Sequence, residues 1–344
     1  MSNFVVTLIR FGVTYGLASL MGFWVLVGSV ILVCRKGPRW FFSKKVRETR
    51  PACMQDSNLG SHGFLRAQDV RLHYVAAGSC SKPLMLFLHG FPECWYSWRH
   101  QLKEFKKDYR VVALDMRGYG ESEVVRGVQN YEMKKLVGDV KEVIAALGYS
   151  SCVLVAHDWG GAVAWTFAMD YPDLVDKLIC MNIPHPHRFV KHISSSWKQM
   201  IKSWYMLYFQ LPALPEYLMS SGDYSTIKNA FHGKKMGLRN RENMTDDDIE
   251  AFKFAISQPG CLTAAVNYYR AAVRYPSKLR HDPQVTSPTL LVWGDEDGAF
   301  DNDVLVGHDK FVKDFTLKKV RGASHWVQQD APEEVNEIMR EFLG

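Results

Sequence analysis

Residues 152–165 read Cys-Val-Leu-Val-Ala-His-Asp-Trp-Gly-Gly-Ala-Val-Ala-Trp, and this stretch decides the fold. The apolar run from Cys152 to Ala156 is typical of a buried parallel strand, and the residues from Gly160 onward predict a helix. Asp158 stands between the two elements, with the small residues Ala156 and Gly160 two positions before and after it. Small residues fit a strand-to-helix turn that is too tight for larger side chains, and such a turn lifts the residue at its apex above the sheet.

The residue at the apex of this turn is an acid, Asp158, where many such turns carry a serine. A carboxylate at a helix N-terminus is held ionised by the helix dipole and by the free N–H groups of the first turn. An ionised carboxylate is already a nucleophile, and it needs no base to activate it. Asp158 is therefore the candidate nucleophile. The simpler interpretation is that it only caps an ordinary helix.

Length and composition fit one large α/β domain that carries an insertion. The chain has 344 residues, of which 47% are hydrophobic and 13% aromatic, and this is enough for a substantial core. The net charge of +6 is modest, and much of it comes from one short segment, so we expect no nucleic-acid partner. Seven scattered cysteines without CxxC spacing indicate free thiols in a reducing compartment, and they favour neither a disulfide framework nor a metal site.

The N-terminal part contains an apolar stretch of 24 residues without a charge, from Phe11 to Cys34, which is long enough to span a bilayer. It is longer than the apolar core of a signal peptide, and a buried helix is the simpler alternative. Only Arg10 precedes it, whereas seven basic residues follow it: Arg35, Lys36, Arg39, Lys44, Lys45, Arg47 and Arg50. The positive-inside rule then predicts a single-pass anchor at residues 11–34, with the following domain in the cytosol, and we expect the endoplasmic reticulum membrane. The glycosylation triplet that begins at Asn243 argues for the opposite orientation.

The rest of the chain alternates between short strands and helices. After a linker at 51–62, strands are predicted at 64–69, 71–77, 84–88, 109–114, 152–156, 178–182, 289–293 and 316–320. Helices are predicted at 131–147, 160–171 and 332–343. This order predicts a mostly parallel sheet with helices on both faces.

About 100 residues separate the strands at 178–182 and 289–293, and that is far too many for a loop. Their aromatic and methionine content, with helix-like stretches such as 246–257, predicts a helical cap. We therefore expect an anchor and basic segment at 1–50, a core at 51–182 and 289–344, and a cap at 183–288.

A second motif, His89-Gly90-Phe91-Pro92, stands at the end of a predicted strand. Gly90 lets the backbone turn so that the Phe91 N–H can point at Asp158. Together with the Trp159 N–H it would form a two-donor oxyanion hole. Taken alone, the motif is equally typical of a simple turn.

Two further motifs supply an acid and a base. Trp293-Gly-Asp295-Glu-Asp297 is a strand that ends in acids, and Gly322-Ala-Ser-His325 follows the last predicted strand. Nucleophile, acid and histidine in this chain order are typical of α/β-hydrolases. Spacing favours Asp297 as the acid that orients His325, with Asp295 in reserve, and a solvated turn is the simpler interpretation.

Three stretches together resemble the epoxide hydrolases of the α/β-hydrolase fold. They are His89-Gly-Phe-Pro-Glu-Cys-Trp-Tyr-Ser-Trp98, Asp115-Met-Arg-Gly-Tyr-Gly120 and His157-Asp-Trp-Gly-Gly161. The similarity runs from about residue 64 to the C-terminus. With the N-terminal apolar span, the chain is most similar to the membrane-anchored vertebrate epoxide hydrolase 3 and 4 group.

The resemblance implies that two cap tyrosines grip the epoxide oxygen. The sequences around Tyr205 and Tyr269 match the two family motifs, and Tyr208 and Tyr268 are the neighbours that could be confused with them. Asp158 would attack an epoxide carbon and form an alkyl ester, and His325 would activate water to hydrolyse it. The product is a vicinal diol, and no metal or cofactor is required. The apolar cap favours lipophilic epoxides, and the family suggests those of unsaturated fatty acids.

Two other functions remain open at this point. A haloalkane dehalogenase also uses an aspartate followed by tryptophan, but Phe91 lacks a polar side chain that could help to hold a halide. A catalytically silent, membrane-anchored binding protein could keep the same fold. Neither the preferred epoxide nor the oligomeric state follows from the sequence.

Overall fold

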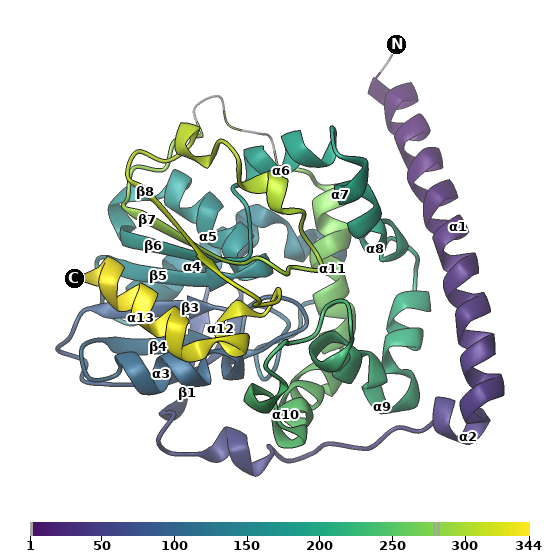
Figure 1. The fold of residues 1–344 in the computed structure, drawn as a ribbon, viewed down its shortest axis with the longest axis horizontal. Helices are drawn as coiled ribbons and strands as arrows, with labels where there is room; N and C mark the ends of the chain where they lie inside the picture. The colour runs from purple at the N-terminus through teal and green to yellow at the C-terminus, as the bar shows by residue number, and fades with distance from the viewer. Residues whose placement is uncertain (1–2, 278–279, 281–282) are drawn as a thin grey trace.

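The computed structural model describes residues 3–344 except 278, 279, 281 and 282. These residues form an eight-stranded sheet in the order β1-β2-β4-β3-β5-β6-β7-β8 (Figure 1). The first two pairings are antiparallel, and all the others are parallel. The strands are β1 Ser61–Ala67, β2 Val70–Ala77, β3 Leu84–Leu88, β4 Arg110–Leu114, β5 Cys152–His157, β6 Val175–Met181, β7 Thr289–Gly294 and β8 Phe315–Val320. The predicted α/β class is confirmed.

Helices cover both faces of the sheet. α3 (Arg99–Phe105), α12 (Val327–Asp330) and α13 (Pro332–Leu343) pack together on one face, and α4 (Met133–Ala146) and α5 (Asp158–Asp170) pack together on the other (Figure 1). α3 was not predicted. Its buried side chains include Arg99 and Gln101, so its buried face does not appear as an apolar period in the sequence.

The central strands are continuous apolar runs, and their predicted positions agree closely with the structure. All side chains of β3 and β5 are buried, as expected for strands covered on both faces. The edge strand β1 is different, because it begins at Ser61 inside the predicted linker. Its first residues are not an apolar run, and they become a strand by pairing with β2, where Ser61 faces Ala76.

Parallel strands bring their carboxyl ends to one edge of a sheet, and this is where ligands bind in α/β folds. Here β3, β5, β6, β7 and β8 end at that edge. The residues that follow them include four of the predicted site residues, Phe91, Asp158, Asp297 and His325.

Among the described residues, six α-helices lie between β6 and β7. They are α6 Pro186–Ile193, α7 Trp197–Lys202, α8 Trp204–Tyr208, α9 Leu214–His232, α10 Asp246–Ser257 and α11 Cys261–Arg274. α10 begins with a capping box, in which the Thr245 side chain and the Asp248 side chain each accept from the other residue's backbone N–H. α9 is interrupted at Ser221, Gly222, Asp223 and Tyr224, where the backbone is not helical.

The chain begins with the long helix α1 (Asn3–Lys36), followed by the short helix α2 (Pro38–Phe41). Among the described residues, one helix, Phe11–Lys36, is long and apolar enough to cross a membrane. α1 lies beside α8 and contacts it (Figure 1). The segment after α2 then runs past α9 and α10 to β1, and its 3-10 helix Ala52–Gln55 contacts α10.

Candidate active site

Asp158 lies at the strand-to-helix turn with φ of 48°, a left-handed conformation that strains any residue other than glycine. The turn fits only because its neighbours lack side chains. A Cβ on Gly160 would lie 2.3 Å from the carbonyl oxygen of Leu88, and one on Gly90 would lie 2.4 Å from the Asp158 Cβ. Contacts of that length do not occur between such atoms, so both glycines are needed to bring the β3 loop against the turn.

The two carboxylate oxygens of Asp158 have different surroundings. Oδ1 accepts a hydrogen bond of 2.8 Å from the Phe91 N–H, and Oδ2 lies 3.6 Å from Nε2 of His325. Within the described part of the chain, the Trp159 N–H donates no hydrogen bond to this carboxylate, so one of the two expected oxyanion donors is engaged. Burial raises the pKa of Asp158, but the hydrogen bond and charge of His325 outweigh it and lower that pKa below its usual value. The carboxylate is therefore ionised at neutral pH.

His325 lies between two acids. Its Nδ1 is 2.9 Å from Oδ2 of Asp297, and its Nε2 faces Asp158. Burial lowers the pKa of His325, but the Asp297 charge and the bonds to Asp158 and Asp297 raise it to about 10. Asp295, the alternative acid, is not the partner of His325. Its carboxylate accepts a 2.7 Å hydrogen bond from the Gly322 N–H.

Tyr205 on α8 and Tyr269 on α11 line the same cavity as Asp158. Their ring centroids are 5.7 Å apart, and the rings are nearly perpendicular. Burial, and after it the charge of Asp158, raises the pKa of both phenols, so both carry their proton at neutral pH.

The two neighbouring tyrosines have hydroxyls that are already used. The Tyr268 hydroxyl donates a 2.8 Å hydrogen bond to the Arg117 carbonyl oxygen. The Tyr208 hydroxyl donates to the Leu214 carbonyl oxygen at 3.5 Å. Neither hydroxyl is free to act at Asp158.

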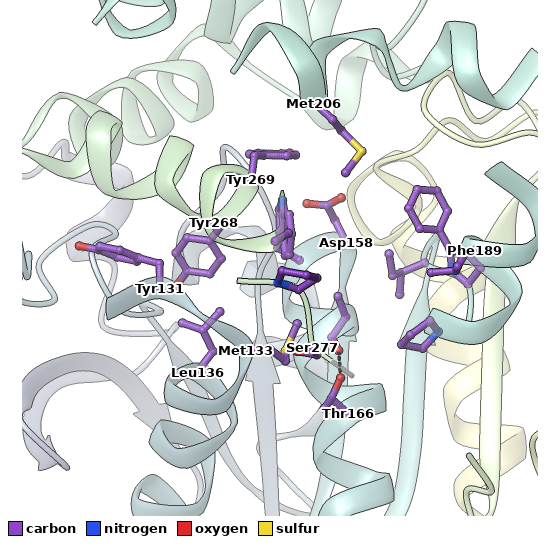
Figure 2. A pocket seen from close by; sticks show the side chains of 18 of the residues that line it. Tyr131, Met133, Leu136, Asp158, Thr166, Phe189, Met206, Tyr268, Tyr269 and Ser277 are labelled. Carbon is purple, nitrogen blue, oxygen red and sulfur yellow. Dashed lines mark hydrogen bonds between the residues drawn. The ribbon is translucent and has the colours of Figure 1, made fainter. Parts of the chain in front are cut away.

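The cavity has a volume of about 310 Å³ and contains few polar groups. Figure 2 shows the Asp158 carboxylate pointing into it, toward Tyr269 and Met206. Trp159 lines it as well. The apolar lining includes Met133, Leu136, Ala162, Ile183, Pro186, Phe189, Val190 and Phe300. Such a cavity suits a lipophilic ligand with one polar group near Asp158.

Asn182 holds the acid in place, and the sequence did not single it out for this role. Its side-chain N–H donates a 2.6 Å hydrogen bond to Oδ2 of Asp297, and its Oδ1 accepts from the Gly294 N–H at 2.9 Å. The other oxygen of Asp297 accepts from two backbone amides, those of Ala299 and Phe300. Burial raises the pKa of Asp297, but the His325 charge and these bonds lower it overall. A polar residue directly after a buried strand was the available signal.

Glu93 links the loop that carries Phe91 to the backbone of His325 through His157. Its Oε2 accepts from the Gly90 N–H at 3.0 Å and lies 2.7 Å from Nδ1 of His157. His157 in turn places its Nε2 2.8 Å from the carbonyl oxygen of His325. Glu93 and His157 both belong to motifs that were recognised, but their contact joins residues that are 64 positions apart.

Comparison with known proteins places this geometry among characterised folds. The family described as alpha/beta hydrolase fold matches residues 83–332. The chain is 45% identical to epoxide hydrolase 4 of Homo sapiens over 312 residues, which cover 90% of this chain and 86% of that protein. It is 42% identical to epoxide hydrolase 3 of Xenopus tropicalis over 343 residues, covering 98% and 93%.

Among solved structures, a mutant of an epoxide hydrolase from Bacillus megaterium, complexed with its product (R)-3-[1]naphthyloxy-propane-1,2-diol, is similar to this chain. The TM-score is 0.75 at 35% sequence identity, and the match covers 82% of this chain and 99% of that one.

Neutralising Asp158 should change the titration of His325. In Asp158→Asn, one of the two negative charges beside His325 is lost, so we expect the pKa of His325 to fall below its wild-type value of about 10. NMR titration of the imidazole measures this directly. Asp295→Asn is the matched control, because that carboxylate binds the Gly322 amide, and it should leave the titration unchanged. Equal titration in Asp158→Asn and wild type would contradict the coupling.

Proposed function

This chain belongs to the epoxide hydrolases of the α/β-hydrolase fold, and we propose that it converts lipophilic epoxides to vicinal diols through an ester on Asp158. One observation carries the proposal. An ionised carboxylate, fixed by the Phe91 N–H and His325, faces a cavity lined by two protonated tyrosines. The core thus supplies a nucleophile, and the cap supplies hydrogen-bond donors.

The first step opens the epoxide ring. An alkoxide is a poor leaving group, so attack at carbon needs a proton donor at the ring oxygen. In the proposed step an Asp158 oxygen forms the new C–O bond while the ring C–O bond breaks. Tyr205 and Tyr269 donate to the oxygen as negative charge develops on it. This is the moment at which preorganised donors lower the barrier most.

The second step hydrolyses the ester. Esterification removes the negative charge of Asp158, which is one of the groups that raise the pKa of His325. The imidazole then gives up its proton more readily and can act as the base for a water molecule. Water attacks the ester carbonyl while the imidazole takes its proton, and the oxygen that becomes negative is stabilised by the Phe91 N–H. When this intermediate collapses, the bond between the Asp158 carbonyl carbon and the ester oxygen breaks, the imidazolium gives its proton to the departing oxygen, and the diol leaves. Asp297 orients the imidazole and stabilises its charged form.

The cavity supports a lipophilic substrate. Its described lining is mostly apolar, and Asp158 is the one charged residue in that lining. Epoxides of unsaturated fatty acids fit this distribution, and the cycle uses no metal or cofactor. A haloalkane dehalogenase is disfavoured because Phe91 offers no polar side chain for a halide.

We also propose the division of the chain into an anchor at 1–50, a core at 51–182 and 289–344, and a cap at 183–288. The helices α6–α11 between β6 and β7 support it. A turnover assay with a fatty-acid epoxide, a trans-stilbene-type epoxide and a bromoalkane would distinguish the proposed enzyme from a dehalogenase and from a silent binding protein.

Removing either tyrosine hydroxyl should slow the first step. A preorganised donor of this kind is often worth about 2–4 kcal/mol, so Tyr205→Phe and Tyr269→Phe should each reduce the rate of ester formation accordingly. The double variant should be nearly inactive. Tyr208→Phe is the matched control, since its hydroxyl donates to the Leu214 carbonyl oxygen. Single-turnover kinetics that showed normal ring opening in both single variants would rule out these roles.

Removing the base should trap the ester. His325→Gln leaves the carboxylate able to attack, so mass spectrometry should find an adduct on the peptide that contains Asp158, and Asp158→Asn should form none. In heavy-oxygen water, a single turnover by excess wild-type enzyme should give unlabelled diol and a labelled Asp158. Labelled diol in that first turnover would mean that water attacks the epoxide directly.

The orientation in the membrane is a further proposal. Seven basic residues between 35 and 50 favour a cytosolic domain anchored in the endoplasmic reticulum. Added protease should therefore digest the domain in intact microsomes, and Asn243 should carry no glycan. A protected, glycosylated domain would show the opposite orientation.

A further inference from the structure

One edge of the cap is exposed but almost uncharged. We define the cap edge as residues 197–219, which comprise α7, α8, the following loop and the start of α9. All 23 residues are described, and eight of them are exposed, of which only one is charged: Trp197, Lys198, Met200, Ile201, Trp204, Pro212, Ala213 and Tyr217. An exposed surface with so few charges marks a contact site, because soluble surfaces place charges between apolar residues.

The other charges of the cap edge are satisfied internally. The Lys202 ammonium donates to the carbonyl oxygens of Asp297 and Phe300. Glu216 pairs with Arg270 at 2.6 Å, and the Glu216 side chain is 14% exposed. The surface that the cap edge presents is therefore more apolar than its composition indicates.

The cap edge is continuous with the apolar helix α1 (Figure 1). A Cβ on Gly22 would lie 2.5 Å from Cδ1 of Leu211 and 3.4 Å from Cδ2 of Leu214, so the helix packs closely there. Ala18, one turn earlier, is fully buried. Gly22 is near the middle of the apolar stretch, so a helix that spans the bilayer carries this contact to the depth of the hydrocarbon.

The connection between α1 and the cap is fixed by a second contact. The Arg47 guanidinium bonds Asp223 at 2.7 Å and Glu250 at 3.0 Å, and its side chain is 4% exposed. The Asp223 N–H also donates to the carbonyl oxygen of Ser43. The segment that leaves the membrane is thus held on the cap.

We propose that the cap edge enters the lipid leaflet beside α1, and that epoxides dissolved in the bilayer reach the cavity from the hydrocarbon. α8 makes this route short, because Trp204 is exposed on it while Tyr205 and Met206 line the cavity. The thickness of one helix therefore separates the cavity from the lipid-facing surface. The entry of epoxides from the bilayer rests on the proposed epoxide hydrolase function, whereas the insertion of the cap edge does not.

Contact with lipid can be measured on the full chain in phosphatidylcholine vesicles. Cys34, Cys53 and Cys80 are replaced by serine, and a polarity-sensitive fluorophore is attached at Ile201→Cys or at Val306→Cys. Val306 is the matched control, because it is also an exposed aliphatic residue (72% exposed) but lies between β7 and β8, outside the cap edge. The label at 201 should shift to the blue and be quenched by acyl-chain quenchers, and the label at 306 should do neither. Water-like emission at 201, or equal quenching at both positions, would overturn the proposal.

Entry of substrate is tested with Met200→Glu/Ile201→Glu, which puts two charges on the cap edge. Turnover of a long-chain epoxide supplied in vesicles should fall by about tenfold, equivalent to roughly 1.4 kcal/mol. Turnover of a short water-soluble epoxide should be unchanged, and Val306→Glu should affect neither. An equal loss on both substrates, or no loss on either, would overturn entry from lipid. If the wild type hydrolysed no epoxide, the proposed function would fail, and the fluorophore experiment would still decide the membrane contact.

Discussion

A single imidazole between two buried carboxylates is the constraint on which the site depends. Asp158 and Asp297 both lose solvation in the fold, and like charges this close to one group would otherwise drive one carboxyl to protonate. The His325 charge lowers the pKa of both, and Asp297 gains further bonds from Asn182 and two backbone amides. Asp297 thus stays charged through fixed hydrogen bonds, whereas Asp158 depends mainly on His325. The acid that we propose as the nucleophile is therefore the one with fewer fixed donors, since Asp158 accepts one backbone hydrogen bond, from the Phe91 N–H.

The contact between Asp158 and His325 also depends on the conformation of the backbone. Asp158 can face His325 only in a strained left-handed turn, and that turn is packed against the β3 loop through Gly90 and Gly160. Glu93 then ties the Gly90 amide to His157, and His157 ties back to the His325 carbonyl oxygen. The oxyanion donor and the base are held by one buried network, so their separation is set by the core.

The sequence predicts those parts of the molecule that local patterns determine. Buried strands such as β3 and β5 are apolar runs, and Asp158 directly follows one of them. His325 was singled out by its place after the last strand, and the structure brings it to 3.6 Å from Asp158. The start of β1 at Ser61 could not be found, because its pairing with β2 determines it. The roles of Asn182 and Glu93 could not be predicted either, since each depends on a contact that spans 64 positions or more. Among the neighbouring tyrosines, the resemblance favoured Tyr205 and Tyr269, and the hydrogen bonds of Tyr208 and Tyr268 give a structural reason for that choice.

The cap must also be held in a fixed position relative to the core. The proposed nucleophile belongs to the core, whereas the two proposed proton donors belong to the cap. Within the cap, the Gln210 side chain donates to the carbonyl oxygens of Met206 and Tyr269, and this fixes α8 against α11. Between cap and core, Gln199 donates to the Ala299 carbonyl oxygen, and Lys202 donates to that of Asp297. The loop that carries the acid is therefore the same loop that holds α7. A change in the position of α7 or α8 would therefore move the two tyrosines and Asp297 together.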